Sequence, residues 1–288
     1  MLIVNPRSGR GLSKSAIGTI VSQLCGSGYA VTVYFSGETS PGQLAFEHAK
    51  NHEMIVCAGG DGTLSAVISG LMRAGTDIPV GYIPMGTAND VATTLTLSKN
   101  PSEAAQTIIN GKPRPIDIGK CSEWYFTYIA AFGAFTGAAY STTQSAKKSL
   151  GHFAYILGGL ADVPAIKARH TVVECDGKAF RGEFIFGGVV NSTSVAGLLK
   201  IDPKQVDLAD GLFEVVLVKQ PIDLADFLDI LASLATQSYG GDNVQMLHAS
   251  HVKFTFEEEV AWTFDGENGG YHRVIEIANY NKAVQIIV

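Results

Sequence analysis

The stretch that decides the fold is Ala58-Gly59-Gly60-Asp61-Gly62-Thr63. It follows the apolar residues 54–57, which predict a buried strand, and it precedes a helical apolar pattern over residues 64–72. Glycines at a strand-to-helix turn let backbone N–H groups approach a bound group closely. The unpaired N–H groups and the dipole at the start of a helix favour phosphate. Asp61 is unexpected there, because a carboxylate in an anion-binding turn implies a cation or a proton transfer.

The bulk composition sets the class of protein. A chain of 288 residues predicts one large or two medium domains, and 46% hydrophobic with 17% charged residues indicates a globular protein. The net charge of −6 argues against a nucleic-acid partner. Four widely separated cysteines without a C-x-x-C pair favour a reduced, cytoplasmic setting. A strand directly after Met1 and a polar-interrupted apolar stretch at 150–166 predict neither a signal peptide nor a transmembrane segment.

The first part of the chain alternates strands and helices. Strands are predicted at 2–4, 30–35, 54–57 and 79–84, and helices lie between them and at 101–110. This order predicts a parallel α/β domain with its ligands at the carboxyl ends of the strands. A second small polar turn, Gly86-Thr87-Ala88-Asn89-Asp90, falls on the same edge, so the two turns are expected to form two walls of one cleft. Residues 111–115 are interpreted as a linker.

The remainder of the chain is rich in strands. They are predicted at 123–132, 171–175, 180–190, 212–218, 252–256, 261–264, 273–277 and 283–288. Asp-Gly turn signals occur at 176, 210 and 265, and two helices are expected at 144–160 and 222–235. The predicted fold class is therefore α/β, with an N-terminal parallel α/β nucleotide-binding domain (1–116) and a C-terminal antiparallel β-sandwich-like domain (117–288).

Several polar features have a structural and a functional interpretation. An Asp-Gly pair is usually a turn, and Asp90 can simply cap its helix. The loop after residue 4 fits neither G-x-G-x-x-G nor the Walker A pattern, so it is either a plain turn or a phosphate contact. His248 and His251 have zinc-like spacing without a nearby third ligand, which favours a strand edge. Lys147 and Lys148 are either a solvated helix end or a contact with anionic headgroups.

The combination of motifs resembles the diacylglycerol kinase catalytic-domain family, and within it the soluble bacterial lipid kinases. The resemblance covers essentially the whole chain and rests on motifs in one order. They are Asn5-Pro6-Arg7-Ser8-Gly9, Gly59-Gly60-Asp61-Gly62-Thr63, Gly86-Thr87-Ala88-Asn89-Asp90, Pro115-Ile116-Asp117-Ile118-Gly119, Phe132-Gly133-Ala134-Phe135-Thr136, Leu150-Gly151-His152-Phe153-Ala154-Tyr155, Asp210-Gly211-Leu212-Phe213-Glu214-Val215 and Asp265-Gly266-Glu267. Many relatives have Asp at the position of Thr136, and Pro203 departs by one residue from their spacing before Asp210.

The resemblance implies roles for individual residues. The ATP site is expected to comprise Asn5, Pro6, Arg7, Ser8, Gly9, Thr39, Gly60, Asp61, Gly62, Thr63, Leu64, Ser65, Ala66, Thr87, Asn89 and Asp90. The Asp265-Gly266-Glu267 turn supplies the proton acceptor, usually assigned to the Glu. By the same resemblance, Asp207, Asp210 and Leu212 are expected to bind a structural Mg²⁺, the first and last through backbone carbonyls.

These assignments give one mechanism for the carboxylates. Without a Walker lysine, backbone N–H groups and Mg²⁺ must neutralise the phosphate charge, and Asp61, with Asp90, is placed to hold that ion. Glu267, with Asp265 beside it, would take the proton from a lipid hydroxyl. Because Glu267 belongs to the second domain, the active site is expected in the cleft between the domains. The expected partner is a lipid at the inner face of the membrane, and a homodimer is a further expectation.

Two other functions stay open at this point. NAD kinases share a Gly-Gly-Asp-Gly turn but carry a second motif unlike Gly-Thr-Ala-Asn-Asp. A nucleotide-binding regulator without catalysis is disfavoured by the intact set of carboxylates. The sequence does not identify the lipid, since the shape of the acceptor pocket is not encoded in a local pattern.

Overall fold

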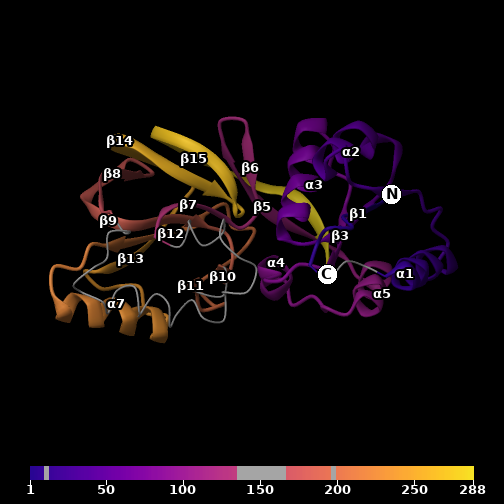
Figure 1. Ribbon diagram of the computed structural model, residues 1–288, viewed down its shortest axis with the longest axis horizontal. Helices are drawn as coiled ribbons and strands as arrows, with labels where there is room; N and C mark the ends of the chain where they lie inside the picture. Colours follow the sequence, from indigo (N-terminus) through magenta and orange to yellow (C-terminus); the bar gives the residue numbers. More distant parts are fainter. Residues whose placement is uncertain (10–12, 135–166, 196–198) are drawn as a thin grey trace. The chain divides into compact units, whose positions relative to one another are not determined.

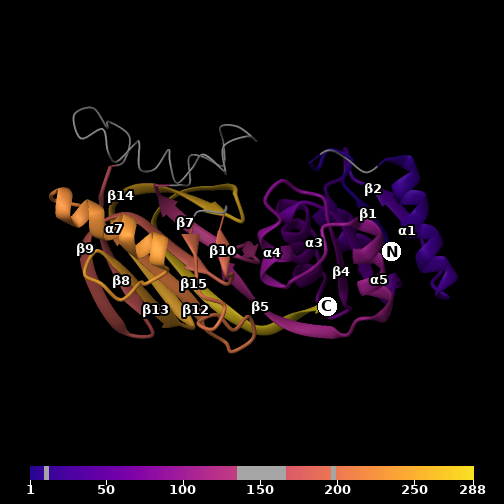
Figure 2. The same ribbon diagram turned by 90° about the horizontal axis from the view of Figure 1, so that it is seen from below.

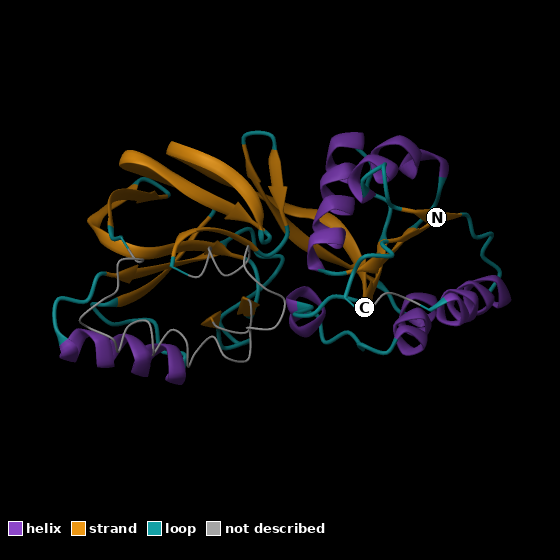
Figure 3. Cartoon of the chain, viewed as in Figure 1, coloured by secondary structure: helices purple, strands orange, loops and turns teal. Residues whose placement is uncertain are grey.

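The computed structural model describes residues 1–9, 13–134, 167–195 and 199–288. These residues form two compact units. The first comprises Met1–Ile118, Leu208–Asp210 and Tyr280–Val288, and the second comprises Gly119–Asp207 and Gly211–Asn279. Most of the helices belong to the first unit, and strands dominate the second (Figure 3). The predicted helix at 144–160, with Lys147 and Lys148, lies outside the described residues.

The first unit is built on a parallel sheet in the order β2–β1–β3–β4. Its strands are β1 (Leu2–Val4), β2 (Val33–Phe35), β3 (Ile55–Gly59) and β4 (Val80–Pro84). β1 pairs with β2 and β3, β3 pairs with β4, and Ile286 near the end of β15 adds a parallel contact to Val80. All residues of β1, β3 and β4 are buried, which explains their continuous apolar character.

Helices cover both faces of this sheet. They are α1 (Lys14–Gly26), α2 (Pro41–His48), the 3₁₀ turn η1 (Ala49–Asn51), α3 (Asp61–Ala74), α4 (Asp90–Thr94) and α5 (Pro101–Asn110). α2 and α3 pack together on one face, while α1 and α5 lie side by side on the other (Figures 1 and 2). Ser13, Ser40 and Asn100 cap three of these helices, and Pro41 and Pro101 begin two of them, as N-terminal signals predict. The order of strands reverses between β1 and β3, where ligands bind in open α/β sheets.

The second unit is mainly antiparallel. Its strands are β6 (Trp124–Phe126), β7 (Ile129–Gly133), β8 (Arg169–Cys175), β9 (Lys178–Val190), β10 (Ser194–Val195), β11 (Leu199–Lys200), β12 (Phe213–Lys219), β13 (Val244–Ala249), β14 (His251–Phe264) and most of β15 (Glu267–Ile287). β5 (Pro113–Cys121) leads in from the first unit. α7 (Leu224–Thr236) connects β12 to β13 and lies along one side of the strands (Figures 1 and 2). The predicted fold class is confirmed.

An aromatic core fills the second unit. Phe132, Phe254, Phe256 and Trp262 form a group of rings with centroids 4.9–6.3 Å apart. Such edge-on and tilted contacts add to the gain from burial alone. The core also takes in Phe126, Phe184, Phe213 and Phe264.

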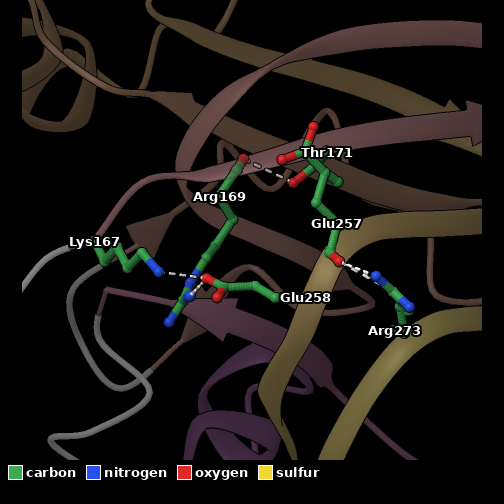
Figure 4. Close-up of polar contacts among 6 residues, drawn as sticks. All are labelled: Lys167, Arg169, Thr171, Glu257, Glu258 and Arg273. Atoms are coloured by element: carbon green, nitrogen blue, oxygen red, sulfur yellow. Dashed lines mark hydrogen bonds and ion pairs between the residues drawn. The ribbon is translucent and has the colours of Figure 1, made fainter.

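A bulge interrupts the pairing of β14 with β15 between Thr255 and Val260. The Arg273 guanidinium donates to the carbonyl of Glu257 in this bulge (Figure 4). Lys167 and Arg169 both form ion pairs with the carboxylate of Glu258. These ion pairs are largely exposed, so they contribute little to stability.

Three local predictions were wrong. The expected linker at 111–115 runs into strand β5, and Lys112 exchanges backbone hydrogen bonds with Val288. The strand predicted at 123–132 is broken into β6 and β7, because the N–H groups of Thr127 and Tyr128 turn to a side-chain carboxylate instead of a neighbouring strand. β13 was missed altogether, since its partly exposed side chains do not alternate in polarity.

Candidate functional site

Three loops lie side by side at the carboxyl edge of the first unit's sheet. They follow β1, β3 and β4, and hydrogen bonds centred on Thr63 join the first two. Asn5 donates its side-chain amide to the Thr63 hydroxyl at 2.9 Å, and the Ser8 hydroxyl lies 3.1 Å from the same oxygen. The backbone N–H of Gly60 donates to the Ser8 hydroxyl at 3.2 Å. Thr63 is buried in the first turn of α3, so the first loop is held at a fixed point on the start of that helix.

Glycine is required where these loops touch. Gly9 has φ +55°, and a Cβ added to it would lie 2.0 Å from the carbonyl oxygen of Met85. A Cβ on Gly86 would lie 2.8 Å from the Cα of Gly60. Both distances are far below van der Waals contact, so any side chain there would separate the loops. The expected neighbourhood of the two Gly-rich turns is confirmed within this unit, and the loop of residues 5–9 is a third member.

The Asp61 carboxylate accepts hydrogen bonds from the next turn. The N–H groups of Asp90 and Val91 donate to its two oxygens at 3.1 and 3.2 Å. Asp61 thereby caps α4, and Asp90 does not cap its own helix as one interpretation expected. These bonds give a structural reason for a carboxylate in this turn.

The second polar turn is closed by Asn89. This residue has φ 54°, and its side-chain amide both accepts from the N–H of Gly86 at 2.7 Å and donates to the carbonyl of Gly86 at 2.9 Å. Asn tolerates the left-handed region better than most residues. Thr87, within this closed turn, is exposed at the edge of the sheet.

The other residues predicted to contact the nucleotide differ in how exposed they are. Pro6, Arg7 and Thr39 are exposed, whereas Gly62, Ser65 and Ala66 are half-buried in the first turns of α3. Leu64 is fully buried in the core. Leu64 can therefore act on a ligand only through its backbone.

In the second unit, Asp265 and Gly266 form the two central positions of a tight hairpin turn. Their φ values are +49° and +82°, and the flanking residues Phe264 and Glu267 are paired across β14 and β15. This geometry is that of a type I′ turn, which favours Asp-Gly. Glu267 is exposed at the first position of β15.

The Asp265 side chain points back into the protein and is 4% exposed. Its oxygens accept hydrogen bonds from the backbone N–H groups of Thr127, Tyr128 and Ile129 at 2.6, 2.9 and 3.0 Å. Hydrogen bonds of this kind, to an ionised acceptor, are stronger than neutral ones. Asp265 thus fixes the turn on which Glu267 is carried.

The loop predicted to hold a structural Mg²⁺ is anchored by Asp117, a residue of the motif at 115–119 for which the sequence predicts no role of its own. Asp117 is fully buried; its N–H donates to the carbonyl of Leu208 at 2.6 Å, and its carboxylate accepts from Asn281 and the N–H of Lys282. Asn281 also donates to the carbonyl of Ala209 at 3.3 Å. A lone Asp between Ile116 and Ile118 was the signal that could have revealed it.

Asp207 and Asp210, on the same loop, are exposed, and Leu212 is half-buried. Carboxylate and carbonyl oxygens within six residues suit a hard cation such as Mg²⁺, so the donor chemistry fits the ion. Among the described residues, no group of three or more His, Cys, Asp and Glu side chains is placed to hold a metal. A site on this loop would therefore depend on backbone carbonyls as well.

The two histidines with zinc-like spacing belong to different strands. His248 on β13 lies 4.0 Å from the buried Glu214 carboxylate on β12. The N–H of His251 on β14 donates to the Asp176 carboxylate. The interpretation of this pair as part of a strand edge agrees with that arrangement.

Comparison with known proteins supports the family resemblance that the sequence motifs indicated. Residues 1–121 match the family model described as the diacylglycerol kinase catalytic domain, and residues 131–287 match the YegS C-terminal NAD kinase beta sandwich-like domain. A protein of Bacillus subtilis (strain 168) named diacylglycerol kinase is 33% identical over 277 residues, covering 93% of this chain and 89% of the relative. One of Staphylococcus aureus (strain USA300) with the same name is 31% identical over 281 residues, covering 93% and 86%.

Solved structures show the same fold. A structure described as a diacylglycerol kinase from Bacillus anthracis str. Sterne aligns with a TM-score of 0.79 at 20% identity, covering 99% of this chain and 95% of that one. Another chain from the same organism aligns with a TM-score of 0.81 at 23% identity and the same coverage.

The fold, the three loops and these matches define a nucleotide-dependent phosphotransferase of the lipid kinase class. The chain belongs to the diacylglycerol kinase family. Use of ATP follows from that membership. No helix among the described residues is both long and apolar enough to cross a bilayer.

Proposed function

We propose that this protein transfers the γ-phosphoryl group of ATP to the hydroxyl of diacylglycerol or a related lipid alcohol. The observation that carries the proposal is the convergence of three small-residue loops at the carboxyl edge of the first unit, joined through Thr63 and closed by contacts at Gly9 and Gly86. Loops of this kind present backbone N–H groups to phosphates at the start of a helix. The family match supports a lipid as the acceptor.

Different residues have different roles in the proposed reaction. The loop of residues 5–9 and the N-terminus of α3 bind and orient the phosphates of ATP, and Thr39 and Thr87 lie on the nucleotide side of the same edge. Glu267 accepts the proton from the acceptor hydroxyl, and its exposure leaves it accessible to a substrate. Asp265 holds the turn that carries Glu267 through its three backbone hydrogen bonds.

Mg²⁺ is part of the proposal. Asp61 and Asp90 would hold a catalytic ion, while Asp207, Asp210 and the carbonyl of Leu212 would hold a structural one. When bound, Mg²⁺ neutralises charge on the transferred phosphoryl group. The hydrogen bonds from the N–H groups of Asp90 and Val91 fix the Asp61 carboxylate beside Asp90, which supports placing these two carboxylates at one ion.

One assay tests the function against its alternatives. The protein is incubated with γ-labelled ATP and Mg²⁺, together with mixed micelles of diacylglycerol or with NAD. Label in a chloroform-extractable product supports the proposal. Label in NADP would instead establish an NAD kinase, an alternative kept because the second unit matches an NAD kinase-like β-sandwich. ATP binding without transfer to either acceptor would establish a non-catalytic regulator.

Matched variants test the roles. Glu267→Gln should fold normally and lose most lipid phosphorylation, by roughly 10²–10⁴-fold. Asp61→Asn should lose activity and also lower thermal stability, because an amide replaces one capping oxygen. A Glu267→Gln protein with wild-type turnover would remove Glu267 from the mechanism. Two accompanying proposals are a cytoplasmic location with peripheral contact with the inner face of the membrane, and a homodimer. Sedimentation with vesicles would test the membrane contact, and light scattering would test the homodimer.

A further inference from the structure

The second unit carries an exposed tryptophan next to the Asp265–Gly266 turn. Trp124 is 42% exposed, whereas Trp262, the other tryptophan of the chain, is 1% exposed. The Trp124 ring stacks on Phe264 with centroids 5.6 Å apart and an interplanar angle of 14°. Phe264 in turn lies 6.5 Å from Trp262 in the core. Trp124 is thus the exposed end of a series of rings that begins in the core.

The position of Trp124 relative to Glu267 is fixed from two sides. Phe264, on which Trp124 stacks, is the strand partner of Glu267. Asp265 binds the N–H groups of Thr127 and Tyr128, three and four residues after Trp124. The Phe264 ring is itself confined, since a Cβ on Gly269 would lie 2.5 Å from it. The indole is therefore held beside the turn that carries the proposed proton acceptor.

The hairpin of β5 and β6 has the side-chain chemistry of a membrane interface. Cys121 pairs with Trp124 across a turn in which Ser122 has φ 50°. Next along the hairpin, the Lys120 ammonium lies 5.3 Å from the centre of the Tyr125 ring. Trp124 and Tyr125 are consecutive on β6, so the indole projects from one face of the hairpin and the Lys120–Tyr125 pair from the other. Residues of these three types are typical of the headgroup level of a bilayer, where an apolar body and a polar tip are both satisfied.

We propose that the Trp124 indole contacts the glycerol and upper acyl-chain region of the lipid acceptor in a bilayer surface and positions that lipid for Glu267. The inference rests on the proposed lipid kinase function, because it takes a lipid as the acceptor. Trp124 is a positioning residue: it orients the lipid, and it takes no part in proton or phosphoryl transfer. The partly open face of the indole loses water on contact with lipid, which favours binding.

Fluorescence provides a direct test without catalysis. Wild-type protein is mixed with phosphatidylcholine vesicles that contain diacylglycerol and carry bromine on the upper acyl chain. Trp124→Phe serves as the blank, because it keeps an aromatic ring on Phe264 and leaves only the buried Trp262 to emit. We expect bromine to quench wild-type emission and to leave the blank unchanged. Equal emission changes in the two proteins would overturn the proposal.

Kinetics provide the second test. Trp124→Ala should raise the KM for vesicle-borne diacylglycerol about tenfold, leaving the KM for ATP unchanged, and Trp124→Tyr should restore most of the loss. Tyr271→Ala is the matched control, since Tyr271 is more exposed at 69% and lies elsewhere on β15. An unchanged lipid KM for Trp124→Ala in an active enzyme would refute the positioning role. A protein that shows Trp124 quenching but phosphorylates no lipid would refute the proposed function and leave the contact standing.

Discussion

Asp265 offers the sharpest test of how the candidate site is built. The substitution Asp265→Asn preserves the size of the side chain and replaces one carboxylate oxygen by an amide NH₂. At best the remaining oxygen keeps the two bonds to Tyr128 and Ile129, and the NH₂ then faces the N–H of Thr127. Two donors would meet in a place that is 4% exposed, where water cannot substitute.

The expected cost follows from that geometry. One buried N–H without an acceptor costs about 1–3 kcal/mol, and the charge on the other two bonds is lost as well, so we expect the free energy of unfolding to fall by about 2–3 kcal/mol. For a domain of this size that corresponds to a decrease in Tm of roughly 4–12 °C. Asp265→Ala removes both acceptor oxygens, and with them all three hydrogen bonds, and should cost more.

The assay compares three variants by calorimetry and by lipid phosphorylation. Glu267→Gln changes an exposed residue and should lose activity at an unchanged Tm. Asp176→Asn is the matched structural control, because Asp176-Gly177 is the same type of turn and its carboxylate also accepts backbone N–H groups, but it is exposed. It should lower the Tm by less than Asp265→Asn does. An Asp265→Asn protein with a wild-type Tm and no activity would refute the structural role of Asp265 in the turn. It would instead support a direct role of Asp265 in the reaction.

Three further outcomes are expected. Gly9→Ala should raise the KM for ATP, because its Cβ would collide with the carbonyl of Met85. Gly18→Ala in α1 is the control: its Cβ meets open space, and it should stabilise the protein by about 0.5–1 kcal/mol. Equal effects of the two substitutions would contradict the loop contact. Loss of some water around the exposed Asp176 carboxylate acts to raise its pKa, but hydrogen bonds from Ser250 and His251 outweigh this effect and lower the pKa below its ordinary value. The carboxylate therefore stabilises the fold above about pH 4 and stabilises it less as the pH falls further. Acid unfolding of wild type and Asp176→Asn should therefore converge at low pH, and parallel curves would argue against this. Burial raises the pKa of Cys121 and of Cys175 to about 11 and also raises that of Cys57, so a thiol reagent at about pH 8 should modify exposed Cys25 alone until the protein unfolds.

Much of the first unit could be predicted from local signals. Its strands are buried on both faces and therefore appear as apolar runs, and Ser13, Ser40 and Asn100 mark the helix starts through side-chain caps. The glycines at 9, 60 and 86 indicated close approach of backbone, and the structure shows what approaches at 9 and 86. These features depend on residues near one another in sequence.

The features that escaped prediction depend on distant partners. The break after β6 exists because Asp265, about 140 residues later, captures the N–H groups of residues 127–129. Asp117 is paired with residues 281 and 282. Its place between two isoleucines marks it as unusual, but no residue near it in sequence identifies these partners. Asp61 likewise caps a helix that begins 29 residues later, so a role inferred from its own turn was incomplete.

The return of the chain to the first unit bears on how the protein is made. Residues 280–288 belong to that unit, and Val284, Ile286 and Ile287 are buried there. During synthesis the ribosome has therefore produced the whole second unit before the first can bury its last apolar side chains. A fragment cut after residue 118 would expose the surfaces of β4 and α5 that these side chains cover. It should therefore be less stable in isolation than the family match to residues 1–121 suggests.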